Sequence, residues 1–327
     1  MEKRELGKVG RSVSVIGLGT WQLGADWGTV DSADAVAVLE TAVDAGVTFF
    51  DTADVYGDGR SEQLIGSFLK SHPGIELTVA TKMGRRLDQL PENYSLDNFR
   101  AWTDRSRNNL GVDVLDLVQL HCPPTAVYSS AAVYDALDTL VAEQRIASYG
   151  VSVETTAEAM TAIQHPGVAS IQIILNAFRQ KPLDEVLPAA LAANVGIIAR
   201  VPLASGLLSG KYRHDTVFAE DDHRNYNRSG AAFDVGETFA GVDFDSGVDA
   251  AVEFARLLPE GMSPAAAALR WVIDQVGVST VIPGARNPEQ ARSNAGAAEL
   301  PELPADLQAN IRALYDERIR PQVHARW

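Results

Sequence analysis

The stretch "FFDTADVYG", Phe49 to Gly57, places a carboxyl group and a phenol a few residues apart, at Asp51 and Tyr56. An ammonium group, Lys82, and an imidazole, His121, stand at the ends of two later apolar runs. An ammonium beside a phenol favours loss of the phenol proton, and a carboxylate keeps the ammonium charged and oriented. An imidazole can donate to a carbonyl oxygen and fix its direction. If these four groups meet, they form a general acid directed at a carbonyl oxygen.

Each of these residues alone also fits a structural role, and a single histidine after a strand is more often structural than functional. Buried aspartate and lysine side chains, however, are rarely tolerated without partners. No serine or cysteine with an adjacent base indicates an activated nucleophile, and one histidine with one aspartate is too small a set to predict a metal site. Protonation of a carbonyl oxygen needs a second reagent that attacks the carbon, and a hydride from a nicotinamide cofactor would serve.

Eight nearly continuous apolar runs alternate with amphipathic stretches along the chain. Apolar runs of this kind suit strands that are buried on both faces of a parallel sheet. The runs cover residues 13–19, 47–53, 77–83, 115–122, 148–153, 170–175, 196–202 and 278–285. The amphipathic stretch between the first two begins at a cap-like Asp31 or Ser32 and stops at Gly46. The alternation predicts an α/β fold, a (β/α)8 TIM barrel, as a single domain over residues 1–327.

An open doubly wound sheet is the competing architecture, and it usually carries G-x-G-x-x-G after its first strand. The stretch "GLGTWQLG" has the first two glycines, but Trp21 and Gln22 follow where a helix should begin, so we interpret it as a turn. The connection after the seventh run, residues 203–245, is long, polar and rich in glycine. Such connections are commonly functional lids, and a disordered insertion is the alternative. After the eighth run, "LPADLQANIRALYDERI" predicts an extra helix outside the barrel.

Bulk composition limits the classes of function. The formal net charge of −15 disfavours binding to nucleic acid or anionic lipid. A local group of Arg and Lys can still hold an anionic cofactor, because salt screens distant charges within ~10 Å. No run of ~18 apolar residues predicts a membrane span, and the charged N-terminus has no apolar signal core. Cys122 is the only cysteine, so no internal disulfide is expected, and a cytoplasmic location is predicted.

Several segments together make the chain similar to the aldo-keto reductase family, in its bacterial branch, over almost the full length. The segments are "RELGKVGRSVSVIGLGTWQLG", "FFDTADVYGDGRSEQLIG", "VATKMG", "LVQLHCP", "YGVSV" and "VIPGARNPEQARSN". The first resembles the family's N-terminal hairpin and first strand, and the second resembles its most specific signature. The resemblance implies a barrel with an N-terminal β-hairpin, a long loop after strand 7 and extra C-terminal helices.

The resemblance also implies an activity. The catalytic tetrad would be Asp51, Tyr56, Lys82 and His121. Tyr56 would protonate the carbonyl oxygen during reduction and take the proton back during oxidation. Lys82, paired with Asp51, would lower the pKa of Tyr56, and His121 would orient the substrate carbonyl. The implied reaction is the NADP(H)-dependent interconversion of aldehydes, ketones or sugars with alcohols. The alternative is a cofactor-sensing subunit of a larger assembly with little turnover, because such relatives can retain the tetrad.

The family holds NADPH extended across the mouth of the barrel without a Rossmann domain, and NADH is the alternative cofactor for this chain. The residues that the resemblance assigns to the cofactor are Gly19, Thr20, Trp21, Asp51, Ser152, Gln172, Arg200, Leu203, Ser205, Gly206, Lys211, Gly284, Arg286, Gln290 and Asn294. Hydroxyl and amide side chains such as Ser152 and Gln172 match the donors and acceptors of a carboxamide. Arg286 is expected to bind the 2′-phosphate, because a guanidinium matches phosphate geometry. The helix that starts near Pro288 would point backbone N–H groups toward it.

Three positions depart from the pattern of many relatives. Val153 stands where relatives carry asparagine, so one contact to the carboxamide is absent. Arg200 stands where relatives stack an aromatic residue on the nicotinamide, and a cation there would shift the redox balance of the cofactor. Gln290 stands where some relatives have arginine. That replacement leaves Arg286 nearly alone and weakens the preference for NADP over NAD.

The substrate side of the barrel mouth is the least specific part of the sequence. The residues expected there are Trp21, Trp27, Tyr56, His121 and Tyr128. Aromatic walls accept aldehydes, ketones and sugar-like rings alike. The sequence therefore leaves open a broad reductase and a dedicated sugar or polyol enzyme, and Trp27 could equally serve packing. The protein is expected to act as a monomer.

Overall fold

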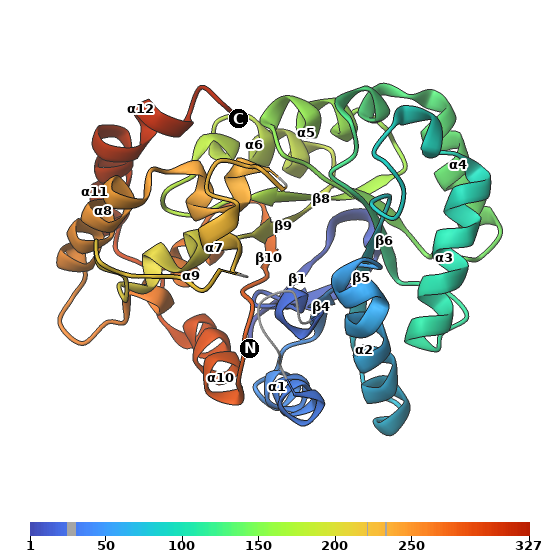
Figure 1. Cartoon of the computed structure of the whole chain (residues 1–327), viewed down its shortest axis with the longest axis horizontal. Coiled ribbons are helices and arrows are strands. Elements are labelled where there is room, and N and C mark those ends of the chain that lie inside the picture. Colours follow the sequence, from blue (N-terminus) through green and yellow to red (C-terminus); the bar gives the residue numbers. More distant parts are fainter. Residues whose placement is uncertain (25–30, 221, 233) are drawn as a thin grey trace.

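The computed structural model describes residues 1–24, 31–220, 222–232 and 234–327. In this part of the chain, eight parallel strands are neighbours in chain order. They are β3 (Leu18–Gly19), β4 (Phe49–Asp51), β5 (Thr78–Met83), β6 (Leu117–His121), β7 (Tyr149–Ser152), β8 (Val168–Ile174), β9 (Gly196–Arg200) and β10 (Val278–Val281). Parallel bridges from Ile16 to Val281 and from Gly19 to Gly284 join the first strand to the last, so the sheet closes (Figure 1). The predicted (β/α)8 barrel is confirmed, and each strand overlaps one of the predicted runs.

Helices surround the barrel and connect its strands (Figure 1). They are α1 (Ser32–Asp44), α2 (Arg60–Ser71), α3 (Leu96–Leu110), α4 (Ala131–Ala142), α5 (Thr156–Ile163), α6 (Val186–Ala192), α7 (His223–Tyr226), α8 (Phe244–Leu257), α9 (Pro264–Ile273), α10 (Pro288–Gly296), α11 (Ala305–Leu314) and α12 (Arg320–Val323). Asp31 caps α1 as predicted, because its side chain accepts a hydrogen bond from the Ala33 N–H. Helix α5 is short, but a capping box of Thr155 and Glu158 marks its start.

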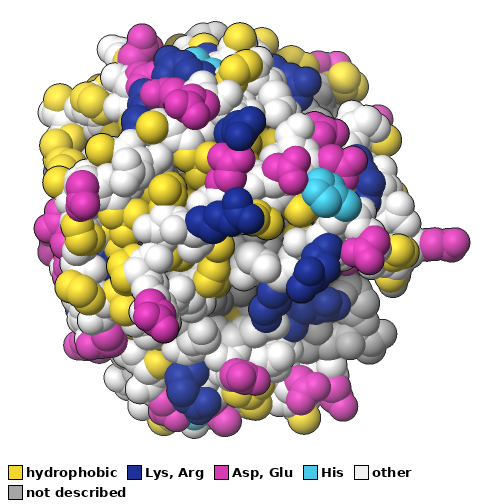
Figure 2. Space-filling view, turned by 90° about the vertical axis from the view of Figure 1, so that its left-hand side faces the viewer, with side chains coloured by type: hydrophobic (Ala, Val, Ile, Leu, Met, Phe, Trp, Pro, Cys, Tyr) yellow, Lys and Arg dark blue, Asp and Glu magenta, His cyan; other side chains and the backbone are white. Residues whose placement is uncertain are grey.

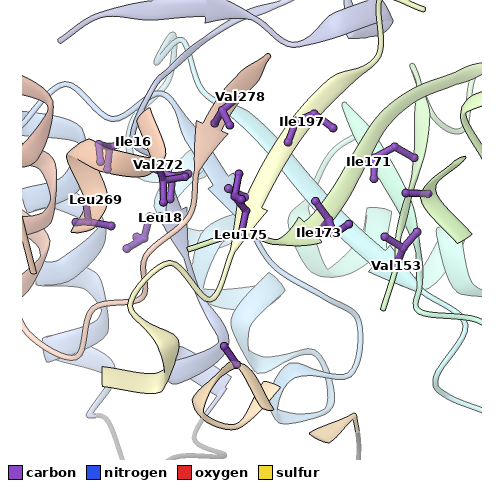
Figure 3. Packing of buried hydrophobic residues seen from close by; sticks show 14 of the residues in the cluster. Ile16, Leu18, Val153, Ile171, Ile173, Leu175, Ile197, Leu269, Val272 and Val278 are labelled. Carbon is purple, nitrogen blue, oxygen red and sulfur yellow. The ribbon is translucent and has the colours of Figure 1, made fainter. Parts of the chain in front are cut away.

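The layer between strands and helices is the main hydrophobic core. Every residue of β5 and β8 is buried, as continuous apolar runs in a parallel sheet require. Helix α9 packs against β10. Figure 3 shows Leu269 and Val272 of this helix in one buried cluster with Val278 of the strand. This layer fixes the positions of the strands, and through them the side chains at the strand ends.

A two-stranded antiparallel hairpin, β1 (Lys3–Glu5) and β2 (Ser12–Ser14), lies at the amino ends of the barrel strands. Its turn approaches the start of β9 so closely that a Cβ on Gly7 would lie 2.1 Å from the Gly196 nitrogen. A separate buried cluster joins the hairpin to the strands. Its members are Leu6, Val13, Phe49, Ala80, Leu117, Ile198 and Ile282. The hairpin therefore fills this end of the barrel with apolar side chains and leaves the other end for polar ones.

The long segment between β9 and α8 is ordered by short helical turns and aromatic packing in the residues that are described. The turns are η7 (Ala204–Ser209), α7, η8 (Val235–Glu237) and η9 (Phe239–Gly241). The rings of Tyr212 and Phe218 are 5.2 Å apart, and those of Phe239 and Phe244 are 5.0 Å apart. At the far end of the chain, α11 continues through η11 (Tyr315–Ile319) into α12, and α11 packs against α8. These are the extra C-terminal helices that were expected.

Candidate active site

The inward faces of the strands change from apolar to polar along the barrel. Side chains two residues apart on a strand point to the same side of the sheet. Four members of the hairpin cluster are each followed two residues later by a polar side chain. The pairs are Phe49 and Asp51, Ala80 and Lys82, Leu117 and Gln119, and Ile198 and Arg200. The strand period thus brings residues from four strands to the carboxyl end of the barrel, where parallel barrels carry their chemistry.

A cleft of about 730 Å³ opens at this end. Its lining includes every residue that the sequence assigned to the cofactor, together with Tyr56 and His121. It also includes residues that the sequence does not indicate, among them Arg85, Cys122, Tyr212, His223, Arg224, Tyr226 and Glu237. All of these lie outside the barrel strands, in connections and short helical turns, where no periodic pattern distinguishes a residue that faces a cleft from one that faces solvent.

Lys82 lies at the centre of the tetrad and is 1% exposed. Its Nζ donates to Asp51 Oδ1 at 2.5 Å and to the Thr52 carbonyl at 2.9 Å. A third bond of 3.3 Å reaches Tyr56 Oη. An ammonium has three N–H donors, so these bonds use all of them. Tyr56 Oη therefore accepts from Lys82, and its own O–H is left to donate into the cleft.

Burial and charge act in opposite directions on this pair. Burial would lower the pKa of Lys82, but the Asp51 carboxylate and Tyr56 outweigh it, so the pKa is raised above its ordinary value. Burial raises the pKa of Tyr56, and the Lys82 ammonium opposes that rise. The ammonium acts in the expected direction, but burial dominates and the net pKa of Tyr56 is not lowered. At neutral pH the lysine is charged and the phenol holds its proton.

His121 meets Tyr56 edge to face, with ring centroids 5.9 Å apart and planes at 85°. Trp21 stacks on Tyr56 with centroids 6.1 Å apart. Burial lowers the pKa of His121 well below 6.5, and nearby cations, of which Arg85 has the largest effect, act in the same direction. The imidazole is therefore neutral at physiological pH. In that form it has one N–H to donate toward a carbonyl oxygen.

The second oxygen of Asp51 is held by two amides. Gln172 Nε2 donates to Asp51 Oδ2 at 2.7 Å, and Gln119 Nε2 donates to the same oxygen at 3.2 Å. Gln172 is one of the predicted cofactor residues, whereas Gln119 was missed. The strand period could have found Gln119, because it stands two residues before His121 on the same face of β6.

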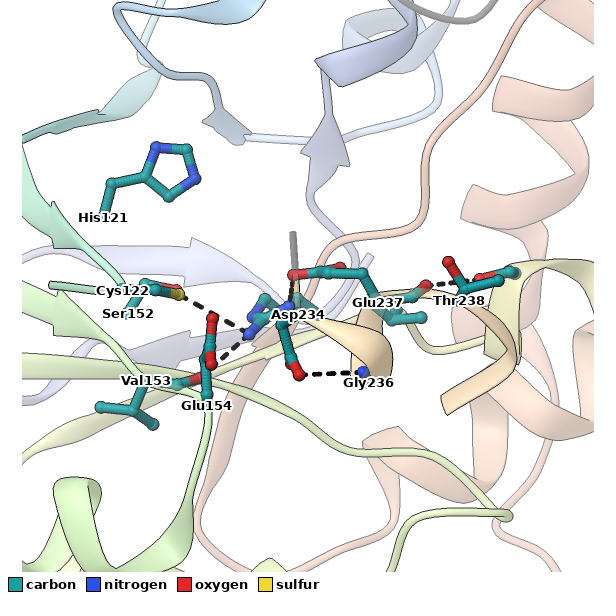
Figure 4. Close-up of polar contacts among 12 residues, drawn as sticks. His121, Cys122, Ser152, Val153, Glu154, Asp234, Gly236, Glu237 and Thr238 are labelled. Carbon is teal, nitrogen blue, oxygen red and sulfur yellow. Dashed lines mark hydrogen bonds and ion pairs between the residues drawn. The ribbon is translucent and has the colours of Figure 1, made fainter. Parts of the chain in front are cut away.

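Arg200 ties the long segment to the barrel. Its guanidinium pairs with Glu237 of that segment and donates to the Val153 carbonyl at 3.0 Å. Its Nη2 also lies 3.8 Å from Cys122 Sγ, and the Cys122 thiol donates to Ser152 Oγ at 3.3 Å. Figure 4 shows these contacts meeting at one place beside the cleft. The protein itself thus fixes the guanidinium on several sides.

Ser205 is occupied by the long segment as well. Its hydroxyl donates to the Glu237 carbonyl at 2.7 Å and accepts from the Phe239 N–H at 3.1 Å. Ser205 lines the cleft, as do its neighbours Leu203 and Gly206, but its hydroxyl supports the segment that covers the cleft. This contact joins residues more than thirty positions apart in the chain. The periodicity of strands and helices cannot predict such a pair.

Hydrogen bonds between β10 and α10 shape the far end of the cleft. Asn287 caps α10 by accepting from the Gln290 N–H at 2.9 Å. Gln290 Oε1 accepts from the Arg286 N–H at 2.9 Å, and Asn294 donates to the Gly284 carbonyl at 3.1 Å. Arg286 therefore lines the cleft from a loop that its neighbours hold in place. The start of a helix beside it favours an anion, because its N–H groups and dipole are positive.

Of the residues predicted for the substrate, Tyr128 does not line this cleft. Trp27 lies outside the described residues. Tyr128 is 1% exposed, and its hydroxyl donates to the Ser152 carbonyl at 2.9 Å. It supports the end of β7 from behind and is not among the lining residues. An aromatic residue in the loop after β6 can turn inward or toward the mouth, and here packing turns it inward.

The charge around the cleft differs from the net charge of the chain. On the face that Figure 2 shows, Lys and Arg side chains lie interspersed with Asp and Glu side chains. Lys211, Arg224 and Arg286 line the cleft, although the formal net charge is −15. An anion in the cleft interacts with these cations more strongly than with distant carboxylates, which salt screens.

The donors and acceptors of the cleft fit a nicotinamide cofactor. Hydroxyl and amide groups at Ser152 and Gln172 suit a carboxamide, and the cations at Lys211 and Arg286 suit phosphates. Within the described ranges, no group of three or more His, Cys, Asp or Glu side chains is arranged to hold a metal ion. None of the helices seen there combines the length and apolar character that a membrane span needs.

The chain is similar to known proteins over almost its full length. The sequence model of the aldo/keto reductase family matches residues 15–316. The aldo-keto reductase YhdN of Bacillus subtilis is 28% identical over 296 residues, which cover 89% of this chain and 86% of that protein. The structure of the glycerol dehydrogenase AKR11B4 from Gluconobacter oxydans superposes with a TM-score of 0.77 at 28% identity, covering 98% of this chain and 96% of that one. An aldo/keto reductase from Klebsiella pneumoniae, solved in complex with NADP and acetate, shares the fold with a TM-score of 0.70 at 23% identity over 96% of each chain.

Proposed function

The chain belongs to the aldo-keto reductase family, and on that premise we propose that it interconverts carbonyl compounds and alcohols with NADP(H), using Tyr56 as the general acid. One observation carries this proposal. Lys82 Nζ donates its three hydrogen bonds to Asp51, Thr52 and Tyr56. Because Tyr56 Oη accepts one of them, the Tyr56 O–H can still donate into the cleft, beside a neutral His121. That arrangement suits proton delivery to a carbonyl oxygen.

When bound, NADPH supplies a hydride to the carbonyl carbon of the substrate. Tyr56 donates its proton to the carbonyl oxygen, and the Lys82 ammonium stabilises the phenolate that forms. Asp51 keeps that ammonium charged and in position. His121 donates an N–H to the same oxygen and fixes its direction. In the oxidation of an alcohol, the Tyr56 phenolate takes the hydroxyl proton back.

The residues that would hold the cofactor lie along the length of the cleft. Ser152 and Gln172 would bind the carboxamide, Lys211 would face the pyrophosphate, and Arg286 would bind the 2′-phosphate. The complex of the Klebsiella enzyme with NADP supports this choice of cofactor. The Gln290 side-chain oxygen accepts a hydrogen bond from the Arg286 backbone N–H. The Arg286 guanidinium is therefore the group expected to distinguish NADPH from NADH.

We propose a small aldehyde, ketone or polyol as the substrate. Trp21, Tyr56 and His121 form the wall next to the reacting oxygen. The His223 ring lies tilted against Trp21, with ring centroids 5.5 Å apart and planes at 43°. Aromatic walls admit small hydroxylated and apolar groups alike. The relative from Gluconobacter is a glycerol dehydrogenase, so glycerol and glyceraldehyde belong in the first panel tested.

The test is the substitution Tyr56→Phe, which removes the phenol and keeps the ring. We expect NADPH consumption with a panel of aldehydes to fall to background, while NADPH binding, followed by its fluorescence, stays near the wild-type affinity. Retained turnover in the variant would exclude Tyr56 as the acid. Wild-type protein that binds NADPH but turns over no aldehyde would favour the cofactor-sensing alternative.

A further inference from the structure

Gln119 touches the tetrad without lining the cleft. It is 0% exposed and stands opposite Lys82 in the register of β5 and β6. Its Nε2 donates to Asp51 Oδ2 at 3.2 Å, and its Oε1 accepts from Gln172 Nε2 at 3.4 Å. One side chain thus uses both ends of its amide, one on a catalytic carboxylate and the other on a residue of the cofactor cleft.

These bonds fix the orientation of the Gln172 amide. Its Nε2 donates to Asp51 Oδ2 at 2.7 Å and to Gln119 Oε1, which uses both amide protons. The Gln172 oxygen is then the atom left for a group in the cleft. If the amide turned over, its oxygen would face two other acceptors, the carboxylate of Asp51 and the oxygen of Gln119, and would have no donor from either. A buried group left in that state is costly, so the observed orientation is strongly preferred.

We propose that Gln119 is a positioning residue that links proton delivery to cofactor recognition. This proposal rests on the proposed function. Through Asp51, Gln119 holds the carboxylate that keeps Lys82 charged beside Tyr56. Through Gln172, it turns an acceptor toward the cleft, where it matches the NH2 group of a nicotinamide carboxamide. Gln119 does not line the cleft, but it orients both Asp51, which acts on proton delivery through Lys82, and Gln172, which recognises the cofactor.

The charged groups around Gln119 come from neighbouring strands. Asp51 on β4 is its direct partner, and Lys82 on β5 is paired with that same carboxylate. On the other side its register partner on β7 is Gly150, and Gln172 on β8 is neutral. Substitutions at position 119 therefore act first on Asp51 and on the Gln172 amide.

The experiment compares Gln119→Leu with Gln119→Glu by NADPH fluorescence titration and by the pH profile of aldehyde reduction. Leucine removes both bonds, and loss of one neutral hydrogen bond in a buried network predicts ~5-fold weaker NADPH binding. We also expect the pH limb that reports Tyr56 to move, since Asp51 loses a donor. Glutamic acid, when protonated, keeps one donor for Asp51 and one acceptor for Gln172. At pH 5.5 it should restore affinity to within ~2-fold of wild type. The matched control is Gln63→Leu, a change on an exposed glutamine of α2.

The outcomes separate this inference from the proposed function. If wild-type protein does not bind NADPH, the proposed function fails and this inference falls with it. If wild type binds NADPH but Gln119→Leu matches it in affinity and in pH profile, only the role of Gln119 is overturned. A leucine variant that misfolds, as judged by circular dichroism, leaves Gln119→Glu to decide. Affinity at pH 5.5 far below wild type in a folded Gln119→Glu protein would overturn the proposal.

Discussion

Asp54 lies between Asp51 and Tyr56 in the chain, and its burial predicts a large dependence of stability on pH. The residue is 0% exposed, and neither carboxylate oxygen has a hydrogen-bond partner of normal geometry among the described residues. Burial raises the pKa of Asp54 from 3.8 to about 7. The neighbouring Glu62 carboxylate acts in the same direction, whereas Arg86 and the nearby Arg105 oppose it. The folded protein therefore prefers Asp54 in its protonated form.

The sign of the effect follows from the raised pKa in the folded state. The contribution of protonated Asp54 to the free energy of unfolding is complete below the unfolded pKa of 3.8, and it is lost as pH rises through about 7. A displacement of this size corresponds to at most about 4 kcal/mol, of which roughly 2.5 kcal/mol is lost between pH 5 and pH 8. Asp54→Asn cannot ionise and escapes this loss. We expect the variant to gain about 2.5 kcal/mol of unfolding free energy relative to wild type on going from pH 5 to pH 8.

Urea unfolding of both proteins at pH 5 and pH 8 measures this difference. Any constant cost of burying the asparagine amide cancels, because only the change with pH is compared. The matched control is Asp97→Asn, which removes one negative charge from a side chain that is 96% exposed. A stability difference between wild type and Asp54→Asn that is the same at both pH values would refute the reasoning.

Two further predictions concern the cleft. Lys82→Met leaves the Asp51 carboxylate buried without its cation, so we expect the unfolding free energy to fall by about 3–5 kcal/mol in urea titrations. In steady-state kinetics kcat should fall by ~10²–10⁴-fold, and a rate within tenfold of wild type would contradict the role of the ammonium. Arg286→Ala removes the guanidinium expected at the 2′-phosphate. It should weaken NADPH binding ~10-fold or more while NADH binding changes little, since charged hydrogen bonds of this kind contribute about 1.5–3 kcal/mol. Equal losses for the two cofactors in fluorescence titrations would remove Arg286 from that role.

Strand periodicity explains how much of the site could be predicted. Asp51, Lys82 and His121 stand at the ends of apolar runs, and a parallel barrel brings such ends together at one face. The structure places these three side chains beside Tyr56, and their catalytic role stays a prediction. Gln119 shares the inward face of β6 with His121, so the strand period could have indicated it. Its role was missed because it depends on a bond to Asp51 on β4, which is 68 residues away in the chain. Tyr128 was expected at the mouth, but its side chain is buried and its hydroxyl donates to the Ser152 carbonyl at the end of β7.

The sequence by itself determined the number and order of the strands, because runs buried on both faces must be apolar throughout. It also determined which strand ends carry acid, amide, ammonium and imidazole groups. The resemblance to the family also implied the pairing of Lys82 with Asp51. Only the tertiary structure decided how the amides and Arg200 are paired. The closed barrel gives both amide protons of Gln172 to its neighbours and brings Glu237 across to Arg200. These pairings depend on strand register and on the path of a long segment, which are set by side-chain packing between distant residues and leave no period in the sequence.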